Sequence, residues 1–259
     1  MKRIIATAIM ALAVGLAPVW AEVDGRISVV YPGAKSAEGK FLDKLFKETK
    51  PIEALAESFN RRFLLPRDIL IVVGETGEIN CCYVGSQHRV YISYDFLWFL
   101  TKLFRTIESE NDARGDAMGA MFFVVLHEMG HALIGELDLP TTGREEDAAD
   151  DFAVLTLNQM GKTGQVYAEA AAKLFHIMGS GKHAKDLLYW DEHSLDMQRF
   201  YSIFGMLYGC DSNRYQWISK FVPARTLSVH QGEHDYKQRS WKRLLAPHLR
   251  DKSANSLKI

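Results

Sequence analysis

The sequence predicts an α+β fold, in which a small sheet comes first and a helical body follows. Residues 68–75 and 88–96 are short apolar or alternating runs with strand character. From Leu97 onward the pattern is almost wholly helical. Residues 117–126, AMGAMFFVVL, are apolar on every side, which predicts a helix that runs through the core. Strands that precede helices, rather than alternate with them, are typical of the α+β class.

The first 21 residues have the pattern of a signal peptide. Lys2 and Arg3 give a positive start, an apolar run follows over residues 4–16, and residues 19–21 end on a small residue suited to cleavage. The apolar run is too short to cross a bilayer comfortably. We therefore expect cleavage after Ala21, with an uncleaved anchor as the alternative. Residues 22–259 are then expected to form a single domain, periplasmic or secreted, with no membrane span.

Charge and cysteine content narrow the class of protein further. The chain has 31 basic and 32 acidic residues, a net charge of -1, so nothing electrostatic points to a nucleic-acid partner. An exported protein can form disulfides. Neighbouring cysteines rarely bond each other, so we expect Cys210 to pair with either Cys81 or Cys82.

The first third of the chain is expected to hold two helices and the sheet. Residues 38–63 predict two amphipathic helices that are broken at Pro51. Residues 68–75 and 88–96, with residues 76–85 between them, predict a small antiparallel sheet of three strands. Helices follow the sheet, over residues 97–104, 117–137, 144–160, 165–178, 194–208 and 233–245.

A polar cluster ends the apolar part of the core helix. His127, Glu128 and His131 follow it directly, and a buried polar cluster is costly unless it has a partner. A helix places His127 and His131 on one face, where two imidazoles can bind one zinc ion. Glu128 then lies near enough to a zinc-bound water to act as general base without being a ligand. Two core histidines and a surface glutamate are the alternative.

A catalytic zinc needs a third protein ligand and an open fourth position. Leu137 occupies the place where the longer H-E-x-x-H-x-x-G-x-x-H motif has its third histidine, so the ligand must come from residues 141–151, TTGREEDAADD. Thr142 and Glu145 have the spacing of a capping box, which gives Glu145 a structural task. Glu146 is therefore the expected ligand, with Glu145 as its rival.

Asp150 lies four residues after Glu146 and shares its helical face. There it could accept a hydrogen bond from the second nitrogen of a ligand histidine, which fixes the orientation of the ring. The remaining carboxylates of the segment are expected to form a solvated acidic face: Glu145, Asp147 and Asp151.

A further histidine is the candidate catalytic donor. His193 stands beside Asp191 or Asp196 in WDEHSLDMQRFY, near a predicted helix start. Hydrolysis of an amide needs a donor aimed at the developing oxyanion, and we expect His193 to supply it, with Tyr201 as the alternative. A second pair, His230 and His234, is expected on the surface, because the sequence around it is strongly polar.

The motifs carry a family resemblance. H-E-x-x-H followed by E-x-x-x-D resembles the gluzincins, zinc peptidases with two histidines and a glutamate as ligands. More closely, LHEMGHALIGELDLPTTGREEDAADDFA, DEHSLDMQRFY and SWKRLLAPH are similar to a bacterial family of metallopeptidases catalogued as a domain of unknown function. This resemblance covers roughly residues 52–248 and implies a zincin-like fold with peptide hydrolysis, but no particular substrate.

The sequence therefore predicts zinc-dependent hydrolysis of a peptide or protein substrate. His127, His131 and Glu146 would hold one zinc ion, and Glu128 would act as base. Residues 88–94 could bind substrate backbone along an exposed edge strand. The alternative is a non-enzymatic zinc-binding or interaction module on the same fold.

Overall fold

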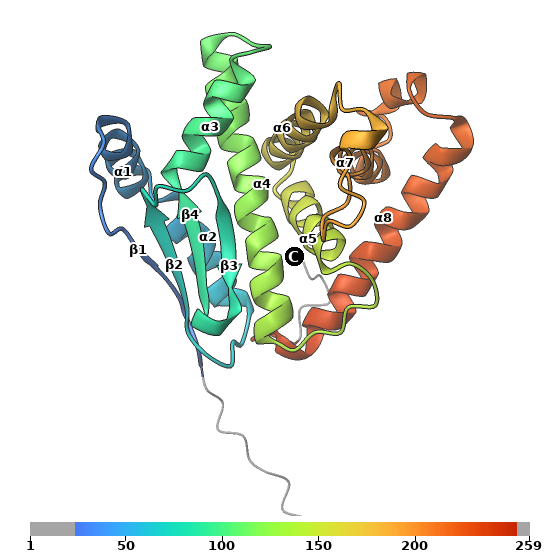
Figure 1. Ribbon diagram of the computed structural model, residues 1–259. Helices are drawn as coiled ribbons and strands as arrows, with labels where there is room; N and C mark the ends of the chain where they lie inside the picture. The colour runs from blue at the N-terminus through green and yellow to red at the C-terminus, as the bar shows by residue number, and fades with distance from the viewer. Residues whose placement is uncertain (1–23, 253–259) are drawn as a thin grey trace, which may run out of the picture.

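The computed structural model describes residues 24–252, so the expected signal peptide lies outside the described residues. Figure 1 shows the sheet with α1 and α2 on one side of the long helix α4, and α5 to α8 on the other. The strands are β1 (Ile27–Val30), β2 (Ile69–Gly74), β3 (Cys81–Val84) and β4 (Arg89–Ser93). The helices are α1 (Ala37–Thr49), α2 (Pro51–Arg62), α3 (Tyr94–Phe104), α4 (Glu110–Glu136), α5 (Glu145–Gln159), α6 (Lys162–Gly179), α7 (Asp196–Cys210) and α8 (Ala224–Leu245).

The α+β class is confirmed, but the sheet differs from the antiparallel sheet of three strands that the sequence predicts. It has four strands in the order β1-β2-β4-β3. β1–β2 and β2–β4 are parallel, and only β3–β4 is antiparallel. α1 and α2 form the crossover that a parallel β1–β2 pair needs. The short strand β1, which the sequence does not signal, adds the fourth strand, and the parallel β2–β4 pair beside the antiparallel β3–β4 pair makes the sheet mixed.

The position of β4 also overturns one expectation. β4 lies between β2 and β3, so residues 88–94 are not an exposed edge strand. β3 is the edge strand next to α4, and the backbone N–H of Tyr83 donates to Glu128 Oε2 at 2.7 Å. The edge strand of the sheet is therefore joined directly to the core helix.

A buried carboxylate fastens the same strand to the end of α4. Glu136 Oε1 accepts from the Tyr83 hydroxyl at 2.6 Å and lies 2.7 Å from His88 Nδ1. Arg67 Nε lies 3.2 Å from Glu136 Oε2 and balances its charge. Tyr83 thus holds β3 against α4 at two points, one through its backbone and one through its side chain.

α4 is the helix that the apolar run predicts. Ser109 caps its start, accepting a hydrogen bond from Asp112 N, and the helix then continues for 27 residues. Among the described residues, α4 alone is long and apolar enough to cross a bilayer, but most of its apolar stretch is buried inside the protein. Its place between the sheet and the other helices explains this burial, because apolar neighbours surround it on all sides.

The sequence pattern predicts one helix boundary correctly and another incorrectly. The break between α1 and α2 is confirmed: Lys50 adopts the left-handed conformation with φ 50°, and Pro51 begins α2. α8 begins at Ala224, well before the predicted residue 233. Its buried residues are Leu227, His234, Trp241 and Leu245, so a histidine occupies a place in the buried stripe where an apolar residue is expected.

The second histidine pair is packed rather than exposed, so the expected surface position is wrong. His234 is 7% exposed. It rests on Gly209 of α7, where an added Cβ would lie 2.5 Å from the His234 Cβ. His230 rests in the same way on Gly205, where an added Cβ would lie 2.4 Å from the His230 Nδ1. Two glycines four residues apart let α7 and α8 approach closely, and the two imidazoles fill the contact.

The expected disulfide is also absent, because Cys81, Cys82 and Cys210 are all free. Cys81 Sγ packs 3.9 Å from the sulfur of Met121 in α4. Cys210 Sγ lies 3.9 Å from Gln165 Nε2 in α6. Cys81 and Cys210 therefore lie against different helices.

Candidate metal centre

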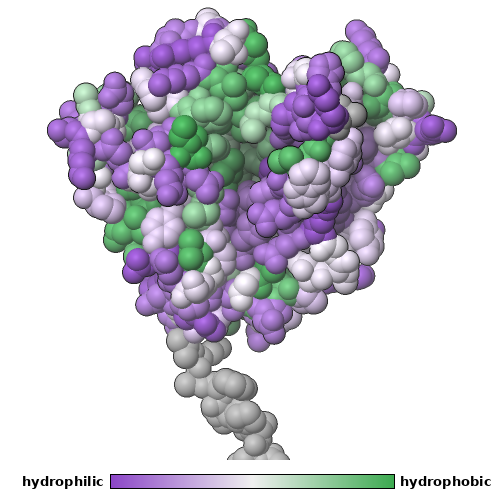
Figure 2. All heavy atoms as spheres, in the orientation of Figure 1, coloured by the Kyte–Doolittle hydropathy of each residue, from purple (hydrophilic) through white to green (hydrophobic). Residues whose placement is uncertain are grey.

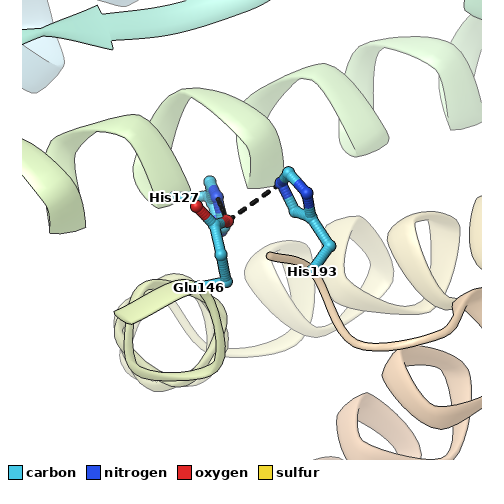
Figure 3. A group of neighbouring side chains, drawn as sticks. All are labelled: His127, Glu146 and His193. Atoms are coloured by element: carbon cyan, nitrogen blue, oxygen red, sulfur yellow. Dashed lines mark ion pairs between the residues drawn. The ribbon is translucent and has the colours of Figure 1, made fainter. Parts of the chain in front are cut away.

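Three segments bring their polar side chains to one place beside α4. His127 and His131 come from α4, Glu146 from the first turn of α5, and His193 from the loop that leads into α7. Figure 3 shows the His127 ring, the Glu146 carboxylate and the His193 ring facing one another across the space between these segments. The helical spacing of His127 and His131 puts both rings on the side of α4 that faces α5.

The distances between these atoms suit a zinc ion. His127 Nε2 and His131 Nε2 are 3.1 Å apart. Glu146 Oε2 lies 3.1 Å from His127 Nε2, and Glu146 Oε1 lies 3.3 Å from His131 Nε2. Tetrahedral zinc with ligands at about 2.0–2.1 Å separates neighbouring ligand atoms by roughly 3.3 Å. The two histidines and the glutamate therefore already have the spacing of a ligand set.

His193 completes a second, overlapping set. Its Nε2 lies 2.9 Å from Glu146 Oε2, and one ligand atom each from His127, Glu146 and His193 lies within 4.8 Å of the other two. Glu146 Oε2 is buried and makes no hydrogen bond, although two imidazole nitrogens lie within ion-pair distance of it. Nitrogen and oxygen atoms that converge without aligned hydrogen bonds fit a cation between them.

Carboxylates on the outer side orient the imidazole rings. A histidine whose Nδ1 is held by a carboxylate presents its Nε2 as the metal-binding atom. All three rings share this arrangement: Nδ1 of His127 is 2.8 Å from Asp150 Oδ1, that of His131 is 2.8 Å from Glu145 Oε1, and that of His193 is 3.1 Å from Asp191 Oδ1.

The electrostatics of the site centre on Glu146. Burial would raise the pKa of this carboxyl, but its contacts with His127, His131 and His193 hold the pKa well below its usual range. Burial would lower the pKa of His131, but Glu146 and Glu145 raise it to about 9. Protons on the imidazoles thus balance the carboxylate charge in the absence of a metal. A divalent cation would take over this role and release the protons.

Glu128 is buried beside this set without belonging to it. It is 8% exposed, and burial raises the pKa of its carboxyl. The Tyr83 N–H is its hydrogen-bond partner and fixes one carboxylate oxygen. A buried carboxyl with a raised pKa holds a proton more readily than an exposed one, which suits it to accept a proton and pass it on.

Arg199 is the partner of Asp150 that sequence reasoning missed. Its Nε and Nη2 donate to Asp150 Oδ2 and Oδ1 at 2.7 and 2.6 Å. Burial would raise the pKa of Asp150, but Arg199 and His127 lower it. Asp150 therefore stays ionised behind His127. A buried carboxylate signals that some cation must pair with it, but not which distant residue supplies that cation.

The acidic segment of α5 is the predicted solvated face in part, because Glu145 and Asp147 are exposed whereas the side chain of Asp151 is only 14% exposed. α5 begins at Glu145, with Arg144 as N-cap and no side-chain cap, so the capping box from Thr142 does not form. Glu145, 46% exposed at its side chain, reaches His131 instead. Asp147 accepts from Ser194 Oγ at 2.6 Å, and Asp151 pairs with Lys237 at 2.8 Å.

The loop that carries His193 is fastened to the start of α5. Arg144 Nη1 donates to the backbone carbonyl of His193 at 2.8 Å, and Ser194 donates to Asp147. These contacts hold the His193 ring over Glu146. Tyr201, the other candidate donor, is exposed and lines a separate cavity, so the structure does not bring it to the site.

A comparison with known proteins identifies one family. The family model described as "Putative metallopeptidase" matches residues 31–245. No curated protein and no solved structure matches this chain. The matched range contains all four side chains of the two donor sets: His127, His131, Glu146 and His193.

Proposed function

This chain belongs to that metallopeptidase family, and from this premise we propose that it hydrolyses peptide bonds with one zinc ion. One observation supports the proposal above all. The Nε2 atoms of His127 and His131 lie next to the Glu146 carboxylate at the spacing of zinc ligands, with Glu128 buried one residue away. Hydrolysis by zinc requires such a ligand set together with a general base.

His127, His131 and Glu146 would be the ligands, and His193 would not. The first three side chains come from two packed helices, whereas His193 comes from a loop. If His193 also bound the metal, four protein ligands would close the position that a catalytic zinc leaves open. When bound, zinc would polarise the scissile carbonyl and acidify a water molecule.

Glu128 would transfer the proton. Its raised pKa suits it to accept a proton from the attacking water and to pass it to the leaving amine. The Tyr83 N–H fixes one of its oxygens and leaves the other free for this task.

His193 would stabilise the negative charge that develops on the carbonyl oxygen. His193 Nε2 lies 2.9 Å from the proposed ligand Glu146, so the ring faces the place where a carbonyl bound at the metal would lie, and a protonated ring would donate to its oxygen from Nε2. Asp191 supports the ring from behind, with one oxygen close to both the backbone nitrogen and Nδ1 of His193.

Metal analysis coupled to a cleavage assay tests the proposal. Purified protein is expected to contain one zinc per chain and to cleave members of a peptide library, with activity that is lost in chelator and restored by zinc. Zinc-loaded protein that cleaves no peptide would instead favour a non-enzymatic zinc-binding module. Protein that binds no zinc at all would overturn the proposal.

We also propose export to the periplasm or the medium, on the basis of the charged start and apolar run of residues 1–21. Mass spectrometry of protein exported from its host is expected to give a mature chain that begins after Ala21. A chain that begins at Met1 would refute the cleavage.

A further inference from the structure

A cavity of about 460 Å³ opens beside the metal centre. His193 and Arg199 form its wall on the side of the site, and the loop before α7 forms much of the rest. Its volume falls within the range of about 300–1,000 Å³ that is typical of small-molecule sites. Figure 2 shows the molecule hollowed between the half with the sheet and the half with α5 to α8.

The floor of the cavity is connected to the metal centre by packed rings. Phe123 stacks on His127 with ring centroids 6.4 Å apart, and Phe175 meets Phe123 edge-on at 6.0 Å. Arg199 lies over the Phe175 ring, with its guanidinium carbon 3.9 Å from the centroid. Two rings, Phe175 and Phe123, therefore separate a group in the cavity from the proposed zinc ligand His127.

The lining selects for apolar groups. Asp186 is exposed, but the other charged residues of the lining have partners: Lys182 pairs with Asp196 at 2.5 Å, and Asp191 Oδ1 lies 3.1 Å from His193 Nδ1. Arg199 is likewise occupied by Asp150. The apolar side chains come from three segments: Phe175 and Met178 of α6, Leu187, Leu188 and Leu195 of the loop, and Met197 of α7.

We propose that this cavity receives the side chain of the substrate residue next to the scissile bond, and that it selects a large apolar residue such as leucine, methionine or phenylalanine. The inference rests on the proposed peptidase function. A peptide whose carbonyl lies at the metal centre must place a neighbouring side chain within reach of His193 and Arg199. The apolar cavity beside these residues removes that side chain from water, which favours apolar over charged residues.

Met178→Lys tests the selectivity, because Met178 lines the cavity and its 39% exposure lets the chain tolerate a polar substitution. The wild-type protein is expected to cleave library peptides with leucine, methionine or phenylalanine at one position beside the cut. Met178→Lys should lower kcat/KM for these peptides at least about tenfold, a typical loss for a disturbed apolar pocket. It should leave the zinc content and the melting temperature unchanged.

Met160→Lys is the matched control. Met160 is 49% exposed, lies at the end of α5 and does not line the cavity. This variant should keep the wild-type preference. Cleavage without a preference for apolar residues would overturn the proposed pocket. An equal loss of kcat/KM in Met178→Lys and Met160→Lys would overturn it as well.

A binding experiment separates failure of the pocket from failure of the peptidase. N-acetyl-phenylalaninamide and N-acetyl-aspartic acid amide can be titrated into zinc-loaded Glu128→Gln protein and followed by NMR. The phenylalanine compound should bind, and Met178→Lys should abolish its binding, while the aspartate compound should not bind. Selective binding of the phenylalanine compound by a protein that cleaves no peptide would reject the proposed peptidase function and support the proposed pocket. Equal binding of both compounds, or no binding of either, would reject the pocket.

Discussion

Two histidine pairs with the same spacing sit on two long helices and have opposite surroundings. His127 and His131 on α4 face a carboxylate from α5, and their ring nitrogens approach to 3.1 Å. His230 and His234 on α8 face glycines of α7, and the buried Nε2 of His234 has no hydrogen-bond partner. The first pair converges on an anion, and the second fills a gap between helices.

The comparison shows that i, i+4 spacing gives two imidazoles a common face but no chemistry of their own. What distinguishes the α4 pair is a second segment that supplies Glu146 and orienting carboxylates. The α8 pair has acidic neighbours on its own helix only, with Glu233 Oε2 3.4 Å from His230 Nδ1 and Asp235 Oδ1 3.2 Å from His234 Nδ1. Four predictions test this difference.

Removal of Glu146 should have the largest effect on the metal. Glu146→Ala leaves only two histidines, so zinc affinity should fall by more than the roughly 10- to 100-fold that loss of a supporting residue costs. Activity should be lost with it. Glu233→Ala removes the acidic neighbour of His230 in the other pair and should change neither zinc affinity nor activity. Equilibrium dialysis measures the zinc affinity of both variants. Full zinc content in Glu146→Ala would show that another ligand set is used.

Glu128→Gln should separate metal binding from turnover. The amide has nearly the same size as the carboxyl but cannot act as a general base. We expect full zinc content with a loss of kcat of at least about a hundredfold. A zinc-loaded variant with wild-type kcat would exclude Glu128 from proton transfer.

Glu145→Ala should weaken the metal site more mildly. Glu145 supports His131 from behind, and we expect about a tenfold loss of zinc affinity, at the low end for such residues because its side chain is 46% exposed. The capping-box interpretation predicts a loss of stability without any change in zinc binding. Zinc titration and a thermal melt of the same variant distinguish the two.

Gly209→Ala should affect the α8 pair and leave the metal untouched. The added Cβ would lie 2.5 Å from the His234 Cβ and 2.8 Å from the His230 carbonyl oxygen, so α7 and α8 must move apart. We expect the free energy of unfolding to fall by about 1–3 kcal/mol, as is typical of overpacking.

Gly232→Ala provides a contrast within the same helix pair. Nothing lies within 4 Å of a Cβ at Gly232, so alanine should instead raise the free energy of unfolding, by up to about 1 kcal/mol. Urea denaturation measures the free energy of unfolding of both variants. Lower zinc content in Gly209→Ala would mean that the two histidine pairs are not independent.

Local patterns predicted much of this structure. The apolar run of residues 117–126 and the polar cluster after it sufficed to place His127, Glu128 and His131 on one core helix, and Pro51 marked a helix boundary correctly. Helical spacing also put Glu146 and Asp150 on one face of α5, next to His127.

Contacts between distant segments were beyond reach of the same reasoning. A capping-box spacing at Thr142 competed with the contact between Glu145 and His131, and only the packing of α5 on α4 decides between them. Arg199 pairs with Asp150 across 49 residues, which no local pattern signals. The polar neighbours of His234 hid its burial, because α7 supplies glycines for it to pack on.

Anomalous diffraction at the zinc edge, from crystals of the zinc-loaded protein, tests the central claim most directly. We expect one peak between α4 and α5, about 2.0–2.2 Å from Nε2 of His127, Nε2 of His131 and an oxygen of Glu146, with His193 outside coordination distance. A peak at the His230–His234 pair, a peak bound by His193 in place of His131, or no peak at all would contradict it.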